Sequence, residues 1–166
     1  LGDTRRIGLT SSEAQIFLGV NVERPGVSSD GRFVVFSTPD NAVDPADTNS
    51  SSDVYLRDRD PDMDGDFDEP NALTRLISLD LAGDAAGGSV NPDISGDARF
   101  VAYATEADDV TPGDDNGAFD VVLADRDPDR NMIFDEGNQV TTLISRSSTG
   151  ERGDARSDEP RVSGEG

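Results

Sequence analysis

The chain has no cysteine, histidine, lysine or tryptophan among its 166 residues. The absence of cysteine excludes a disulfide framework and a thiolate nucleophile, and the absence of histidine excludes Ser-His-Asp triads and imidazole zinc sites. Aromatic residues make up only 5%, which is few for a sugar-binding cleft between paired carboxylates. No glycine-rich phosphate loop follows a predicted strand. We therefore expect that the protein is not an enzyme.

Positive charge is also scarce. The basic residues are 14 arginines against 35 acidic residues, and the formal net charge is −21. This excess of carboxylates disfavours nucleic acid as a partner. It suits a salty or calcium-rich exterior, where counterions screen the self-repulsion, and it would equally follow from a genome that favours Arg and Asp. We expect an extracellular or cell-surface location, with the periplasm as the alternative.

Long apolar runs are missing as well. Hydrophobic residues make up 33% of the chain, and no stretch is long enough to predict a membrane span. The chain starts without the pattern of a signal peptide, as expected of a mature exported form or of an excised piece. Low hydrophobicity with a high net charge is also typical of disorder. The internal repeat argues against disorder, because disordered tails rarely keep strand-like apolar alternation in register.

The sequence repeats itself at a distance of 67 residues. Residues 28–80 align with residues 95–147 without a gap, and 26 of the 53 positions are identical. The longest shared blocks are SSDGRFVVFST with SGDARFVAYAT, DVYLRDRDPD with DVVLADRDPD, and TRLIS with TTLIS. This self-similarity indicates the duplication of one supersecondary unit. We refer to residues 25–90 as the first repeat and to residues 91–158 as the second repeat.

Each repeat is predicted to form four short strands, so the expected fold class is all-β. The runs are rich in β-branched and aromatic residues and are bounded by Gly, Pro, Asn and Asp, and no window shows a helical period with caps. A tight polar turn at Asp30-Gly31, or at Asp97-Ala98, precedes the second strand of each repeat. The predicted strands are residues 25–28, 33–38, 53–57 and 73–78, and then residues 92–95, 100–105, 120–124 and 140–145.

The blocks resemble the TolB-type, WD-like β-propeller repeat. That repeat combines P-x-x-S-x-D-G-R-x-h-A-F with G-D-T-N-G-x-x-D-h-F-h-x-D and T-x-h-h-S, where h is apolar. The chain has PGVSSDGRFVVF, ADTNSSSDVYLRD and TRLIS, and then PDISGDARFVAY, GDDNGAFDVVLAD and TTLIS. The resemblance covers nearly the whole chain from about Pro25 onward and implies that each repeat is a four-stranded propeller blade. It implies little about function, because propellers host many activities.

The ends of the chain are out of phase with these blades. Residues 6–10 match the last strand of a preceding blade, and residues 160–163 match the first strand of a following one. Closed propellers need about 4–8 blades, and only two are present here. We expect unpaired edge strands at both termini, where backbone groups would be open to pairing with other chains. The predicted regions are 1–24 with two edge strands, 25–90 blade one, 91–158 blade two, and 159–166 the first strand of a following blade.

One of the two edge strands within residues 1–24 has no counterpart in the second repeat. Apolar side chains alternate there at Ile16, Leu18, Val20 and Val22. This alternation is typical of a half-buried strand. It packs either on its own blade or, as the alternative, on another subunit.

A loop rich in aspartate, DPDMDGDFDE, joins the third and fourth strands of the first repeat. Ca²⁺ prefers six to eight hard oxygen ligands, which a short loop supplies when carboxylates alternate and a glycine lets the chain curl. The loop resembles the D-x-D-x-D-G-x-x-D calcium hairpin of integrin alpha-chain propellers. The alternative is an acidic turn that is merely solvated. The predicted ligands are Asp60, Asp62, Asp64, the backbone carbonyl of Asp66, and Asp68.

The second repeat carries a weaker copy of this loop, DPDRNMIFDE. Met132 stands in the place of the glycine, which costs strain if the position needs a positive φ. Fewer charges predict a lower affinity for Ca²⁺. The predicted ligands are Asp127, Asp129, Asn131, the backbone carbonyl of Ile133, and Asp135.

Polar residues also join the second and third strands of each repeat. They are Asp47, Asn49 and Asp53 in the first repeat, and Asp114, Asn116 and Asp120 in the second. Their spacing could complete a cation site, but we favour ordinary turns, for which Asp and Asn are common. Asn49-Ser50-Ser51 is a glycosylation sequon, which predicts a possible glycan at Asn49 if the protein is exported.

These features favour an extracellular, calcium-stabilised structural repeat protein. We expect it to associate with itself through edge strands into a larger oligomer or filament. The alternative is a segment of a cell-surface or periplasmic propeller that binds proteins or glycans.

Overall fold

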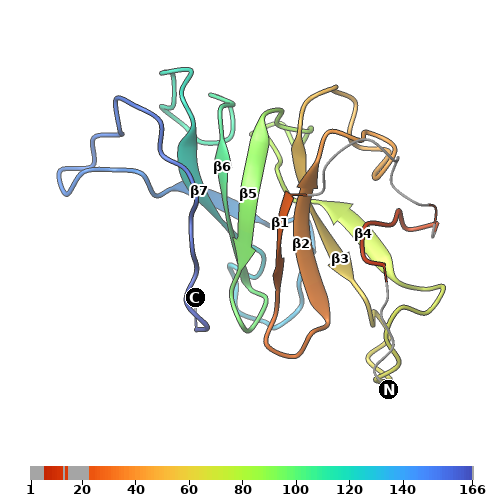
Figure 1. The fold of residues 1–166 in the computed structure, drawn as a ribbon. Coiled ribbons are helices and arrows are strands. Elements are labelled where there is room, and N and C mark those ends of the chain that lie inside the picture. The colour runs from red at the N-terminus through yellow and green to blue at the C-terminus, as the bar shows by residue number, and fades with distance from the viewer. Residues whose placement is uncertain (1–5, 13, 15–22, 166) are drawn as a thin grey trace.

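The computed structural model describes residues 6–12, 14 and 23–165, and these residues contain strands and no helix. Eight strands form two four-stranded antiparallel sheets, each in sequence order (Figure 1). The predicted all-β class is therefore confirmed. The first sheet contains β1 (Glu23–Val27), β2 (Phe33–Thr38), β3 (Asp53–Asp58) and β4 (Leu73–Leu76). The second sheet contains β5 (Ser89–Ile94), β6 (Phe100–Thr105), β7 (Asp120–Asp125) and β8 (Val140–Leu143).

The two sheets are built in the same register. Phe33 pairs with Asp58 at one end of the first sheet, and Phe100 pairs with Asp125 at the same place in the second. A serine hydroxyl closes the turn before each of these phenylalanines. In the first sheet, the hydroxyl of Ser28 accepts the N–H of Phe33 at 3.0 Å. The turn needs a residue with positive φ, supplied by Gly31 (φ 78°) and, at some conformational cost, by Ala98 (φ 65°).

The first strand of each sheet begins earlier than predicted, because it crosses a bulge. The pairing shifts register between Glu23 and Gly26 in β1, and between Val90 and Asp93 in β5. Arg24 and Asn91 have positive φ at these bulges, and each precedes a proline. A bulge re-aims the strand without ending it. The proline marks the middle of the strand and not its start.

The two sheets stack head to tail, so that one face of the first sheet packs against the opposite face of the second. On the first sheet, the buried apolar residues that face the second are Phe33, Val35, Val54, Leu56 and Ile77. The second sheet faces them with the opposite set of alternating positions: Val101, Tyr103, Val122, Ala124 and Leu143. Since neighbouring residues of a strand point to opposite faces, the front of one sheet covers the back of the next. The second sheet therefore keeps the equivalent of the first sheet's buried face on its outside.

The predicted end strands are not formed in the described residues. Leu9 makes only an isolated bridge, and the hydroxyl of Thr74 in β4 donates to the carbonyl of Leu9 at 2.8 Å. Ser11 adds two bonds to the backbone of Thr74, at 3.0 and 2.9 Å, which cover part of the outer edge of β4. Residues 160–163 run beside β5 without pairing as a strand, held by the N–H of Val162 on Asp93 at 2.9 Å.

The remaining predicted strand, Ile16 to Val22, lies outside the described residues. No helix in the described part of the chain is long and apolar enough to cross a membrane.

Candidate metal centre

The acidic loop of the first repeat curls around the carboxylate of Asp60. This residue lies two positions beyond the end of β3, and its N–H donates to Asp58 at 3.1 Å. Its two oxygens accept the N–H groups of Asp64 and Gly65, each at 3.1 Å. The curl needs positive φ at Met63 (60°) and Gly65 (93°), the second of which is the glycine that the sequence pattern required.

This curl brings Asp60, Asp62 and Asp64 together. One carboxylate oxygen from each residue lies within 4.8 Å of the other two, and the group could hold a metal ion. Asp60 is only 6% exposed, whereas Asp62 and Asp64 face solvent. A partly buried carboxylate flanked by two exposed ones gives a cation both a fixed ligand and an entry path.

The other two predicted ligands of this loop are placed differently. Asp66 is exposed, and its N–H donates to Asp64 at 2.9 Å. Asp68 points to Arg59, which binds both of its oxygens at 3.0 and 2.7 Å. A carboxylate held at both oxygens by a guanidinium is a clamp on the loop, and it stands outside the group of three.

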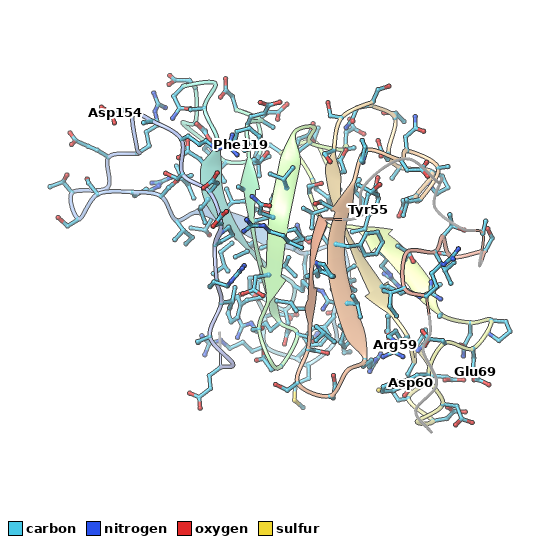
Figure 2. All side chains as sticks on the ribbon, viewed as in Figure 1. Tyr55, Arg59, Asp60, Glu69, Phe119 and Asp154 are labelled. Atoms are coloured by element: carbon cyan, nitrogen blue, oxygen red, sulfur yellow. The ribbon has the colours of Figure 1, made fainter. Side chains whose placement is uncertain are left out.

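Glu69, which the sequence pattern did not include, lies near the group of three but is not one of its converging carboxylates. The charges of Asp64, Asp62, Asp66 and Asp60 raise the pKa of Glu69, with Asp64 the largest cause. Its carboxylate therefore lies within the electrostatic influence of these negative charges. Figure 2 shows Arg59, Asp60 and Glu69 at one end of the first sheet. The signal that could have found it is the block FDE, which both repeats contain.

The loop of the second repeat has the same curl but a different centre. Asp127 accepts the N–H groups of Asn131 and Met132 at 2.9 and 3.0 Å, just as Asp60 does in the first repeat. The side-chain N–H₂ group of Asn131 donates to Asp129 at 3.1 Å and to Glu136 at 2.8 Å. An amide thus lies between two carboxylates at the position where the first loop has a third carboxylate.

Three further predicted features of the second loop can be placed. Met132 has φ 64°, so the position does require the positive φ that glycine adopts without cost. Ile133, predicted to offer its carbonyl, is exposed. Asp135 is bound at both oxygens by Arg126, at 2.9 and 2.6 Å, and so repeats the clamp of the first loop.

The two arginine clamps differ in their surroundings. Arg126 has a fully buried side chain, stacks on Phe134 at 4.6 Å and on Phe33 of the first sheet at 4.8 Å, and donates to the carbonyl of Ala98 at 2.6 Å. Arg59 stacks on Phe67 at 4.8 Å and leaves 17% of its side chain exposed. The second clamp is therefore part of the contact between the sheets, and the first lies at the outer side of the molecule.

The loop between β2 and β3 is a hydrogen-bonded turn, as favoured from the sequence. The side-chain N–H₂ of Asn49 donates to Asp53 at 3.0 Å and to the carbonyl of Ala85 at 3.2 Å. Burial raises the pKa of Asp53 to about 6. The phenol of Tyr55 donates to Asp47. The nitrogen that a glycan would need on Asn49 is thus engaged within the fold.

The comparisons with known proteins assign no family. No family model matches the sequence, and no curated protein matches it.

Proposed function

We propose that this chain is a calcium-stabilised structural repeat module of the extracellular space that adds further sheets of the same repeat to its open face. The observation that carries the proposal is the head-to-tail packing of two sheets with the same register. Such packing is heterologous, and heterologous contacts extend unless they close into a ring.

The open face is the outer side of the second sheet. Its apolar positions correspond, 67 residues later, to positions that the second sheet buries on the first. Ile144 is 50% exposed where Ile77 is 1% exposed, and Val121 and Leu123 are half-buried where Val54 and Leu56 are fully buried. The positions of this face are Phe100, Ala102, Val121, Leu123 and Ile144. Of these side chains Ile144 is exposed, Phe100, Val121 and Leu123 are half-buried, and Ala102 is buried. A sheet face whose large apolar side chains stay partly accessible to solvent is a candidate interaction surface.

One aromatic ring on this face has fewer guanidinium partners than its equivalent in the first sheet. Two guanidinium groups stack on Phe33, Arg32 at 4.6 Å and Arg126, which follows β7, at 4.8 Å. Phe100, its equivalent, has Arg99 at 4.7 Å, and no second guanidinium stacks on it within the described residues. A further repeat with an arginine at the position of Arg126 would complete this contact.

Calcium is supported by the chemistry of the first acidic loop. The group of Asp60, Asp62 and Asp64 offers only hard oxygen ligands, and Glu69 adds a fourth carboxylate nearby. Ca²⁺ prefers such ligands and tolerates irregular geometry. Binding to the folded loop and not to the unfolded chain would stabilise the protein.

Sedimentation velocity across a concentration series, with Ca²⁺ and then with EGTA, tests the proposal. We expect self-association in Ca²⁺ that the substitution Ile144→Asp abolishes, since the carboxylate would have to be buried in the contact. The exposed Leu81→Asp serves as the control and should leave the association unchanged. A protein that stays monomeric at every concentration, or that associates equally well with Ile144→Asp, would contradict the proposal.

The second candidate is a binding module for proteins or glycans. A groove of about 460 Å³ lies between the open face and residues 160–163, and its lining includes Ala102, Val121, Leu123 and Ile144. A monomer that binds a glycan or peptide through this groove, with loss of binding in Ile144→Asp, would favour the second candidate over assembly.

A further inference from the structure

The loop between β6 and β7, residues 106–119, contains a buried carboxylate oxygen with no partner. Asp114 is 7% exposed, and its Oδ1 makes no hydrogen bond. Thr111, three residues earlier, is 2% exposed, and its hydroxyl also has no partner. Buried polar atoms are nearly always bonded to protein, water or an ion. Two such oxygens in one short turn point to a ligand there.

The first repeat shows how the same carboxylate can be satisfied. At the equivalent position, Asp47 accepts the phenol of Tyr55. The second repeat has Val122 in place of this tyrosine, so the donor is lost. Asp44, which accepts the N–H of Leu76 at 3.2 Å, is replaced by Thr111. The loop of the second repeat therefore lacks two interactions that close the first.

The same loop has gained a negative charge. Asp108 replaces Asn41, whose amide donates to the carbonyl of Asn49 at 3.3 Å. Burial first, and then the charges of Asp120 and Asp108, raise the pKa of Asp114. The facing basic group is Arg152, which lowers this pKa but is itself bound to Asp115 and to the carbonyl of Gly113. A water molecule could fill the space but would not offset the charge.

We propose that Asp114 Oδ1, the Thr111 hydroxyl and the carboxylate of Asp108 bind a divalent cation, Ca²⁺, in the loop between β6 and β7. The loop lies at the end of the second sheet where Phe119 is labelled in Figure 2. Asp120 anchors the end of this loop. Its oxygens accept the hydroxyl of Ser145 and the side-chain N–H₂ of Asn116, the latter at 2.9 Å. Asp108 accepts the N–H of Gly117 at Oδ1, at 2.9 Å, and in the proposed site its other oxygen would bind the cation.

This site differs in kind from the first acidic loop. Among the described residues, three carboxylates converge within 4.8 Å only at Asp60, Asp62 and Asp64. The site at Asp114 has two carboxylates and a hydroxyl, and water would complete the shell. Fewer charged ligands weaken binding, so we expect a Kd of about 10⁻⁴–10⁻³ M, the range of extracellular calcium modules.

The test uses the full chain with Asp62→Asn and Asp64→Asn, which silence the first loop. Equilibrium dialysis with radioactive Ca²⁺ should still find one ion per chain. Adding Asp114→Asn should remove this ion. Asp108→Asn restores the residue of the first repeat at an exposed position, and it should weaken Ca²⁺ binding about tenfold, or about 1.4 kcal/mol. Asp129→Asn, in the other loop of the second repeat, should leave it unchanged.

The reciprocal substitution sharpens the test. Asn41→Asp should create no new site in the first repeat, because Tyr55 still satisfies Asp47. Three results would overturn the proposal. They are no bound Ca²⁺ in the silenced background, binding that survives both Asp108→Asn and Asp114→Asn, and loss of binding with Asp129→Asn. A crystal structure grown in Ca²⁺ with only water between Thr111 and Asp114 would also overturn it. None of these outcomes depends on the first loop or on assembly.

Discussion

The two repeats have the same strands and the same arginine clamps but solve the problem of negative charge in different ways. In the first acidic loop, Asp64 leaves three carboxylates facing one another; in the second, Asn131 places an amide between Asp129 and Glu136. In the loops at the other end of the sheets the roles reverse, because Asp47 accepts the phenol of Tyr55 while Oδ1 of Asp114 has no hydrogen-bond donor. The two repeats share the scaffold, and single substitutions decide which loop brings three carboxylates together.

The largest expected difference between the repeats is in their arginine clamps. Arg126→Ala should lower the free energy of unfolding by about 3–5 kcal/mol, because it leaves Asp135 without its partner inside a buried contact. Arg59→Ala should cost less than half as much, since its ion pair is partly exposed. Urea denaturation of the two variants measures the difference. Equal losses would mean that the stacking of Arg126 on Phe33 contributes nothing to the contact between the sheets.

Removal of Ca²⁺ should affect the first acidic loop more than the second. Binding to the folded state alone stabilises by about 2.7 kcal/mol when Ca²⁺ is present at 100 times Kd. We expect EGTA to lower the melting temperature of the protein, and the double substitution Asp62→Asn with Asp64→Asn to remove most of this response. Asp129→Asn should retain it, because Asn131 already occupies the centre of the second loop. A response that vanishes with Asp129→Asn alone would reverse the comparison.

A smaller difference between the repeats is expected at the equivalent positions Gly65 and Met132, which both have a positive φ. Met132→Gly should raise the free energy of unfolding by about 1 kcal/mol, since a non-glycine residue with positive φ carries a conformational cost. Gly65→Ala should lower it by a similar amount. Chemical denaturation of both variants checks this. If Met132→Gly destabilises the protein, the exposed methionine makes a contact that offsets its backbone strain.

The smallest expected effect is the titration of Glu69. Its pKa lies above the ordinary value because of Asp64 and its neighbours, so the folded protein binds this proton more tightly than the unfolded chain. The contribution of Glu69 to stability is therefore lost as the pH rises through its pKa. Carbon-detected NMR titration should show this raised pKa without Ca²⁺ and a fall in the pKa when Ca²⁺ is added. No change with Ca²⁺ would place Glu69 outside the cation's reach.

Much of the fold was predictable because the strands are short and strongly patterned. The bounds of β2 and β6 match the sequence pattern, since Phe33 and Phe100 follow a turn with clear polar signals. The bulges at Arg24 and Asn91 were not predicted, because arginine seldom has a positive φ and a residue before proline favours the extended region. The strands predicted at residues 6–10 and 160–163 rested on similarity to the repeat alone, and in the structure these two segments contact the sheets through a few hydrogen bonds without forming a strand ladder.

The candidate site was predictable in part for a similar reason. Alternating carboxylates and a glycine indicate a curled acidic loop, and Asp60, Asp62 and Asp64 do converge. The same pattern could not tell a ligand from a clamp. Asp68 lies in the expected place along the chain, but Arg59, the residue after β3, donates to both of its oxygens. Glu69 was missed because its approach to Asp64 depends on how the loop folds back.

By itself, the sequence determined the repeat, the all-β class, the turns and the position of the acidic loops, because these depend on local patterns within a few residues. Only the tertiary structure decided which acids face one another and which face arginine. It also decided that the sheets stack front to back, which leaves the face at Ile144 open. These outcomes depend on contacts between residues far apart in the chain, and no local pattern of side chains specifies them.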